Sequence, residues 1–220
     1  MNPPPEDLRR LSPIRRVVAR KMTEAWLSIP AVTLHRTLPF AGLLATRERL
    51  GAAGRKPALD VLMAILVARA LSEFDLLNGS WREDARAVLV HPDRNIAIAV
   101  DTPLGLSAVV LRDVDRRPPL ELDSDLVEMV GRAREGRSLP DDVANATFTI
   151  TNLGGLGIEF FNPIITPPQS GVLGIGAIRR EPADERPAAV SLTFDHRVVD
   201  GADAARFLGR LAELAGEARF

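Results

Sequence analysis

An almost entirely apolar helical segment is the feature that most constrains how this chain can fold. It begins at Pro57 and runs to about Phe74. Apolar side chains occupy nearly all of its helical faces, at Leu59, Val61, Leu62, Met63, Ile65, Leu66, Val67 and Leu71. A helix on the protein surface keeps a polar face, so a helix of this kind must be covered by other elements. We therefore expect residues 57–74 to be buried against a β-sheet.

The rest of the chain mixes helical and strand-like patterns. Ser12 can cap a helix whose first residue is Pro13. Apolar residues then recur at helical spacing, at Ile14, Val17, Val18, Met22, Ala25 and Trp26. From Val32 to Leu38, apolar and polar residues alternate as in a half-buried strand. By the same criteria we expect helices at 41–53, 120–134 and 202–219, and strands at 87–90, 95–100, 106–111, 146–151, 171–178 and 188–199.

These segments predict one α/β domain with a largely mixed sheet, covering residues 12–220. Helices and strands intermix without a strict βαβ rhythm, and no sequence period repeats. Residues 1–11 are expected to form a flexible leader, because Pro3 to Pro5 are followed by charged residues rather than by an apolar segment.

Composition restricts the partners that the chain can have. A formal net charge of -1 over 220 residues provides no field to hold a polyanion, so we expect no nucleic-acid partner. The basic cluster from Arg9 to Lys21 is interpreted as the solvated face of an amphipathic helix rather than as an anion site. No apolar run reaches the roughly 20 residues that span a bilayer, and the first residues lack a signal segment. We expect a cytoplasmic protein with no membrane partner.

The scarcity of reactive side chains narrows the chemistry further. The sequence has 0 cysteines, which excludes thiolate nucleophiles and cysteine-bound metals. It has 3 histidines, His35, His91 and His196, and none has another histidine at a metal-binding spacing. We therefore expect no metal. His35 is predicted to be a surface strand residue, and His91, which precedes Pro92, to lie in a turn.

His196 differs from the other histidines in its surroundings. It follows an apolar strand that contains Leu192 and Phe194, and the chain then turns through Asp200-Gly201 into a helix. A residue at such a strand end is held on a rigid element and is often functional. Desolvation there would keep the imidazole neutral and able to accept a proton. The pattern alone leaves a purely structural histidine open.

Two further residues are candidates for supporting roles. Asp200 is either a carboxylate that orients His196 or a structural group that caps the last helix. We favour a structural or supporting role, for which a pair with an arginine is one form. Thr151 ends a strand that runs into the glycine-rich segment 153–157. Its hydroxyl could stabilise an oxyanion by ~3 kcal/mol. The glycines match neither a P-loop nor a dinucleotide fingerprint, and no Gly-x-Ser-x-Gly elbow is present.

Several motifs together resemble one family. They are Ser12 to Met22, Ile29-Pro30, Asn78-Gly79-Ser80-Trp81, Ile96 to Pro103, Phe148 to Gly154, Pro163 to Pro168 and Asp195 to Gly201. In this order they resemble the catalytic domain of the dihydrolipoamide acyltransferases, the E2 components of 2-oxoacid dehydrogenase complexes. Through these enzymes the chain also resembles chloramphenicol acetyltransferase.

The resemblance implies a chloramphenicol acetyltransferase-like fold in which a mixed sheet packs against helices. It also implies a homotrimer with active sites at subunit interfaces, where coenzyme A and the acceptor enter from opposite ends. In this scheme His196 matches the general base that deprotonates the acceptor. Thr151 matches the hydroxyl residue that steadies the tetrahedral intermediate from the neighbouring subunit, and Asp200 matches a residue that supports the site. No acyl-enzyme forms.

The sequence also departs from the family. No lipoyl domain, subunit-binding domain or long linker precedes Ser12, and no leucine-rich tail follows Phe220. The segment 105–111 lacks the proline that is usual in the corresponding strand. These departures lead us to expect a free trimer.

Three functions are compatible with this resemblance. The first is a stand-alone enzyme that moves acetyl from acetyl-CoA to a hydroxyl of a small-molecule acceptor, such as a tetronate-type polyketide intermediate in antibiotic biosynthesis. The second is an E2 core that transfers acyl groups between a dihydrolipoyl group and CoA. The third is a non-catalytic scaffold with the same fold. The first is the main expectation.

Overall fold

The computed structural model describes residues 9–181 and 186–220. Most of the predicted leader, residues 1–8, therefore lies outside the described residues. The helices are α1 (Pro13–Ser28), α2 (Ala41–Leu50), α3 (Leu59–Leu71), α4 (Pro119–Arg134), α5 (Pro140–Val143) and α6 (Gly201–Glu217). The strands are β1 (Ala31–Pro39), β2 (Gly79–Arg82), β3 (Ala87–Val90), β4 (Ile96–Thr102), β5 (Gly105–Leu111), β6 (Phe148–Asn152), β7 (Gly171–Ile178) and β8 (Pro187–Asp195).

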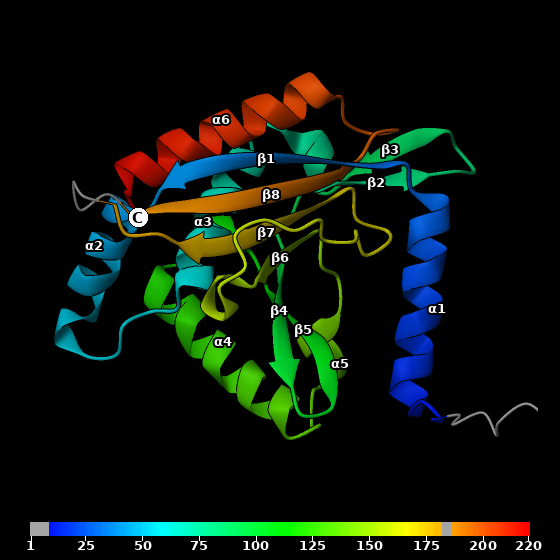
Figure 1. Ribbon diagram of the computed structural model, residues 1–220, viewed down its shortest axis with the longest axis horizontal. Coiled ribbons are helices and arrows are strands. Elements are labelled where there is room, and N and C mark those ends of the chain that lie inside the picture. The colour runs from blue at the N-terminus through cyan, green and yellow to red at the C-terminus, as the bar shows by residue number, and fades with distance from the viewer. Residues whose placement is uncertain (1–8, 182–185) are drawn as a thin grey trace, which may run out of the picture.

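A six-stranded mixed sheet organises the domain, in the order β1-β8-β7-β6-β4-β5. β6 runs parallel to both β4 and β7, and the other neighbours are antiparallel. β2 and β3 form a separate two-stranded hairpin. The predicted α/β fold with a mixed sheet is confirmed. β2 was not predicted from the sequence, and it extends from the main body beside the end of β8 (Figure 1).

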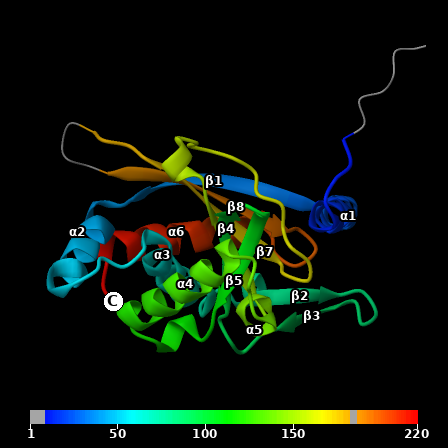
Figure 2. The same cartoon turned by 90° about the horizontal axis from the view of Figure 1, so that it is seen from below.

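Helices α3, α4 and α6 cover one face of the sheet (Figure 2). The predicted burial of the apolar helix is confirmed, because every residue of α3 from Val61 to Leu71 is buried except Arg69. Phe148, Phe194 and Phe207 are fully buried between these layers. Burying a large apolar side chain contributes about 1.5–3 kcal/mol, so this layer supplies most of the hydrophobic stabilisation.

The opposite face of the sheet is covered by a long connection between β6 and β7. Glycines on β7 allow this connection to lie directly on the sheet. A Cβ atom at Gly174 would lie 2.7 Å from the Phe161 ring, and one at Gly176 would lie 1.9 Å from the carbonyl oxygen of Glu159. Both distances are shorter than real contacts. The sheet and the connection therefore approach each other more closely than any larger residue at these two positions would permit.

Helix α1 is largely exposed in a single chain. Ser12 caps it as predicted, since its Oγ accepts a hydrogen bond of 3.3 Å from the amide of Arg15. Its apolar side chains, however, remain largely uncovered. Ala25 is buried, but Trp26 is 70% exposed and Val17 is 44% exposed. The helix stands at the edge of the domain instead of lying on the sheet (Figure 1). Its apolar face is thus available to a second chain.

The last strand also ends earlier than predicted. β8 stops at Asp195 rather than at residue 199. The amides of Val198 and Val199 donate hydrogen bonds of 2.9 and 3.0 Å back to the carbonyl oxygen of Asp195. These bonds form a tight turn over residues 196–198. His196 therefore lies in the turn after the strand, and not within it.

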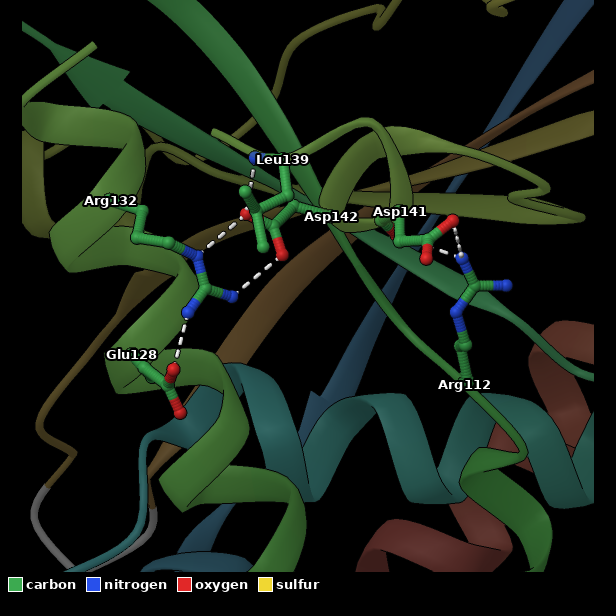
Figure 3. Close-up of polar contacts among 6 residues, drawn as sticks. All are labelled: Arg112, Glu128, Arg132, Leu139, Asp141 and Asp142. Carbon is green, nitrogen blue, oxygen red and sulfur yellow. Dashed lines mark hydrogen bonds and ion pairs between the residues drawn. The ribbon is translucent and has the colours of Figure 1, made fainter. Parts of the chain in front are cut away.

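An ion-pair network fixes the segment that leads into β6 (Figure 3). The guanidinium of Arg132 donates to both carboxylate oxygens of Asp142, at 2.8 and 2.6 Å, and it also binds Glu128. These bonds hold the pKa of Asp142 below its ordinary value. Arg112 donates a bond of 2.8 Å to the carbonyl oxygen of Asp141. Since each carboxylate engages an arginine, the network has a structural role.

Among residues 9–181 and 186–220, no cluster of three or more metal-binding side chains is present. Within the same ranges, no helix is both long enough and apolar enough to cross a bilayer.

Candidate active site

The backbone of His196 is anchored, while its side chain is exposed. Its amide donates a hydrogen bond of 3.1 Å to the carbonyl oxygen of Pro30, just before β1. The imidazole lies beside the ring of Phe194, with 5.7 Å between the ring centroids. The desolvation expected around His196 is therefore absent in a single chain, because the turn projects beyond the end of the sheet. A partner surface would have to supply it.

Asp195 and Arg197 form a clamp across His196. Asp195 is only 2% exposed, and its carboxylate accepts bonds from the guanidinium of Arg197 at 3.0, 3.2 and 2.7 Å. The amide of Arg197 donates to the same carboxylate at 3.0 Å. The hydrogen bonds that Arg197 donates to Asp195 raise the pKa of Arg197, although partial burial opposes the rise. The clamp therefore links the residues directly before and after the candidate base.

The β2–β3 hairpin supports this clamp. The guanidinium carbon of Arg197 lies 5.4 Å from the centre of the Trp81 ring, within the range of a cation–π interaction. The indole nitrogen of Trp81 donates a bond of 2.7 Å to Glu83. Sequence reasoning noted the motif that contains Trp81 but gave it no role. Its position against Arg197 shows that it supports the turn that carries His196.

Removing the arginine of this clamp should destabilise the fold. In Arg197→Met the buried carboxylate of Asp195 loses its charged partner, so we expect the free energy of unfolding to fall by about 2 kcal/mol. Urea unfolding followed by circular dichroism measures the change. Arg206→Met is the matched control, because Arg206 is 67% exposed and pairs with Asp203 on the surface of α6. Equal losses in the two variants would contradict the clamp.

Asp200 makes neither of the contacts expected for it. It occupies the N-cap position of α6, but its side chain forms no capping hydrogen bond. Within the described ranges its carboxylate pairs with no arginine, because the neighbouring Arg197 is engaged by Asp195. The favoured pairing with an arginine is therefore not present in a single chain. The exposed carboxylate is left facing solvent, or a partner, beside the His196 turn.

Thr151 lines a largely apolar cavity of about 420 Å³ on the sheet face opposite the helices. The floor of the cavity is formed by small residues of β4 such as Ala97 and Ala99. Its sides come from the β6–β7 connection and from α1, which contributes Val18 and Lys21. Thr151 is half-buried, and its hydroxyl has no hydrogen-bond partner among the described residues. The hydroxyl is therefore free to donate to a bound group.

Behind Thr151, a half-buried series of polar contacts fixes the end of β6. The side-chain amide of Asn152 donates a bond of 2.7 Å to the carboxylate of Asp60, in the first turn of α3. Its carbonyl oxygen accepts a bond of 2.9 Å from the amide of Gly154. Burial raises the pKa of Asp60, and the bond from Asn152 lowers it by a smaller amount. Sequence reasoning missed Asp60 and Asn152.

His196 and Thr151 lie far apart within one chain. Thr151 is paired with Gly174, and Gly174 with Ser191, which is five residues before His196. At about 3.3 Å per residue, β8 alone puts roughly 16 Å between the level of Thr151 and His196. A single chain therefore cannot bring these two side chains onto one substrate atom.

The other two histidines have local partners. His35 is exposed on β1, as predicted, and its Nδ1 lies 2.8 Å from Ser191 Oγ. His91 lies between β3 and β4, also as predicted, with its Nε2 2.7 Å from Ser80 Oγ. His35 is at the same level of the sheet as Thr151, but β8 and β7 lie between their strands. His91 follows the separate β2–β3 hairpin. His196 remains the histidine whose imidazole has no hydrogen-bond partner in the described part of the chain.

This fold and site define an acyltransferase catalytic domain of the E2 type. Residues 3–218 match the model of the family of 2-oxoacid dehydrogenases acyltransferase (catalytic domain). The chain belongs to this family.

Individual relatives agree with the family match. The chain is 34% identical over 222 residues to the dihydrolipoyllysine-residue acetyltransferase component of the pyruvate dehydrogenase complex of Haemophilus influenzae. The aligned region covers 95% of this chain but 39% of that protein. The chain thus spans well under half the length of this curated relative.

Solved structures give the same fold. A structure of the Azotobacter vinelandii dihydrolipoamide acetyltransferase has a TM-score of 0.91 at 30% identity, covering 100% of this chain and 98% of that one. Chloramphenicol acetyltransferase has a TM-score of 0.58 at 13% identity, covering 89% of this chain and 94% of that one. The second likeness concerns the fold alone, and it confirms the predicted chloramphenicol acetyltransferase-like architecture.

Proposed function

We propose that this chain transfers an acyl group, of which acetyl is the simplest, between coenzyme A and the thiol of a dihydrolipoyl group. The observation that carries the proposal is the match of the whole domain to E2 acetyltransferases, together with the free hydroxyl of Thr151 and the exposed imidazole of His196. The relatives favour this thiol acceptor over the small-molecule hydroxyl that the sequence analysis put first.

The residue types support the same mechanism. The Azotobacter vinelandii enzyme was studied for the catalytic roles of a serine, a histidine and an asparagine, and its histidine and asparagine are four positions apart. Here His196 and Asp200 have the same spacing, and Thr151 carries a hydroxyl as serine does. Asp200 stands in place of the asparagine. This difference leaves the base and the hydroxyl unchanged.

In the forward reaction the neutral imidazole of His196 removes the proton from the attacking thiol of CoA. The sulfur then attacks the carbonyl carbon of the acyl-dihydrolipoyl thioester. The carbonyl oxygen becomes an oxyanion, and the hydroxyl of Thr151 donates a hydrogen bond to it. When the intermediate collapses, the bond to the lipoyl sulfur breaks and the imidazolium returns its proton to that sulfur. The products are acyl-CoA and the free dihydrolipoyl thiol.

The active unit in this proposal is a homotrimer. Because roughly 16 Å of strand separates His196 from the level of Thr151, the two residues must come from different subunits to act on one carbonyl. The uncovered apolar face of α1, where Trp26 is 70% exposed, supports association with another copy. Such association would also supply the desolvation that His196 lacks in a single chain.

Acceptor competition tests the proposal. The purified protein is incubated with acetyl-CoA and either dihydrolipoamide or a tetronate-type primary alcohol, and release of CoA is followed. We expect turnover with the thiol and none above the His196→Ala background with the alcohol. Turnover of the alcohol alone would restore the small-molecule function. Absence of turnover with both acceptors would favour the non-catalytic scaffold.

A further inference from the structure

We propose that Asp60 is a positioning residue for this acyl transfer, because through Asn152 it holds the strand end that carries Thr151. The inference rests on the proposed function, since it concerns how the hydroxyl of Thr151 is placed. Asp60 lies in the first turn of α3, on the opposite side of the sheet from the cavity that Thr151 lines. It therefore acts without touching the substrate.

The contacts form a continuous chain from the helix to the strand end. Asp60 accepts a bond of 2.7 Å from the amide nitrogen of Asn152, and the amide oxygen of Asn152 accepts one of 2.9 Å from Gly154 N–H. A carboxylate only accepts, whereas the two ends of an amide differ. Asp60 thus fixes which end of Asn152 faces the backbone of the following turn.

That orientation determines where β6 ends. Asn152 is the last residue of β6, and the amide of Leu153 continues the ladder with a bond of 3.0 Å to the carbonyl oxygen of Ile175. Beyond this point the bond from Gly154 to Asn152 turns the chain into the short 3-10 helix η4 (Gly154–Leu156). Adjacent strand residues face opposite sides of a sheet, so a shift of Asn152 moves Thr151 on the other face.

The charge of Asp60 argues against a purely structural role. No lysine or arginine in the described ranges pairs with its carboxylate, and burial raises its pKa. Even a half-buried carboxylate without a cation loses part of the solvation that keeps it ionised. The first turn of α3 offsets part of this cost through the helix dipole. By contrast, Asp123, which binds the amide of Ala58 at the same helix end, pairs with Arg55.

Steady-state kinetics with dihydrolipoamide test the proposal through a double-mutant cycle. Asp60→Leu removes the acceptor, and misplacement of a reacting group by about 1 Å costs ~100-fold in rate, so we expect kcat to fall between about 10- and 100-fold with KM little changed. Asp60→Asn keeps an acceptor oxygen for Asn152 and should retain most of kcat. In the Thr151→Ala background, Asp60→Leu should cause no further loss.

The control is Asp123→Asn, which weakens the same end of α3 without touching Asn152. It should lower the unfolding midpoint and leave kcat unchanged. If Asp60→Leu slows the Thr151→Ala enzyme by the same factor as the wild type, or if it leaves kcat unchanged, the positioning role is overturned.

A second measurement separates this proposal from the proposed function. Amide hydrogen exchange at Gly154 should accelerate in Asp60→Leu but stay near the wild-type rate in Asp60→Asn and in Asp123→Asn. This readout does not require turnover. If the wild-type protein is inactive toward dihydrolipoamide, the proposed function is wrong. If the exchange rate at Gly154 is unchanged in Asp60→Leu, Asp60 does not fix the strand end.

Discussion

Replacing His196 with alanine should lower kcat for acyl transfer by about a thousandfold and leave the fold intact. General bases contribute about 10²- to 10⁴-fold to rate, and the His196 turn holds no second imidazole. The carboxylate of Asp200 is a weaker base than an imidazole. Stability should be unaffected, because the side chain is exposed and makes no hydrogen bond within the described residues. Steady-state rates with dihydrolipoamide and the thermal unfolding midpoint measure the two effects.

The other histidines are matched controls for this substitution. His91→Ala removes one hydrogen bond to Ser80 and should cost about 1 kcal/mol of stability with no loss of kcat. His35→Ala, on β1, removes one hydrogen bond to Ser191 of β8 and should likewise leave kcat unchanged. If His196→Ala lowers the unfolding midpoint and dissociates the protein while the rate per folded site is unchanged, His196 is structural and the general-base role is wrong.

The sequence predicted most of the fold because its periodicity reports burial directly. The apolar side chains of residues 57–74 could leave water only if other elements covered the helix, and α3 is buried as expected. The pattern of α1 was equally clear, but it gave no indication of what covers the apolar face. Periodicity shows that a helix face is to be buried, and it does not show whether the same chain or another one covers it. Trp26 and Val17 therefore appear exposed in one chain.

The sequence singled out only those candidate residues whose side-chain chemistry is visible in a local pattern. His196 and Thr151 stand in recognisable local patterns, and the structure places both at strand ends. Asp195 was passed over, because an acidic residue beside a histidine gives no sign of whether it contacts that histidine or the arginine two positions later. The bidentate bonds to Arg197 arise from the turn geometry after β8. No linear pattern encodes that turn.

Asp60 and Trp81 were missed for a different reason. Each acts through a contact between elements that are distant in sequence, α3 with β6 and β2 with the β8 turn. A carboxylate in the first turn of a helix is common enough to be explained by the helix dipole alone. β2 has only four residues, too few for an alternating pattern to distinguish it from a loop.

Two inactive variants should restore activity when they are assembled into mixed trimers. We expect His196→Ala and Thr151→Ala each to lose most of kcat. In the proposed trimer each site takes its base from one subunit and its hydroxyl from the next. A complete site therefore forms wherever the Thr151→Ala subunit supplies His196 and the His196→Ala subunit supplies Thr151. Random mixing of equal amounts makes about a quarter of all sites wild type, and a trimer that contains both variants has about a third of its sites intact, so about a third of wild-type activity should return in the mixed trimers.

The test requires the two variants to be co-expressed with different affinity tags and the doubly tagged trimers to be isolated. Mixing the same proteins after assembly, without subunit exchange, is the control and should remain inactive.

A chain carrying both substitutions, co-expressed with wild type, shows whether the recovered rate depends on which subunit holds the intact pair. A site formed within one subunit predicts no recovery in any mixture of the single variants, because no chain then holds both His196 and Thr151. Recovery near a third in the isolated mixed trimers would place the reacting carbonyl between subunits, where the apolar face of α1 is also uncovered. No recovery in these trimers would refute the shared site.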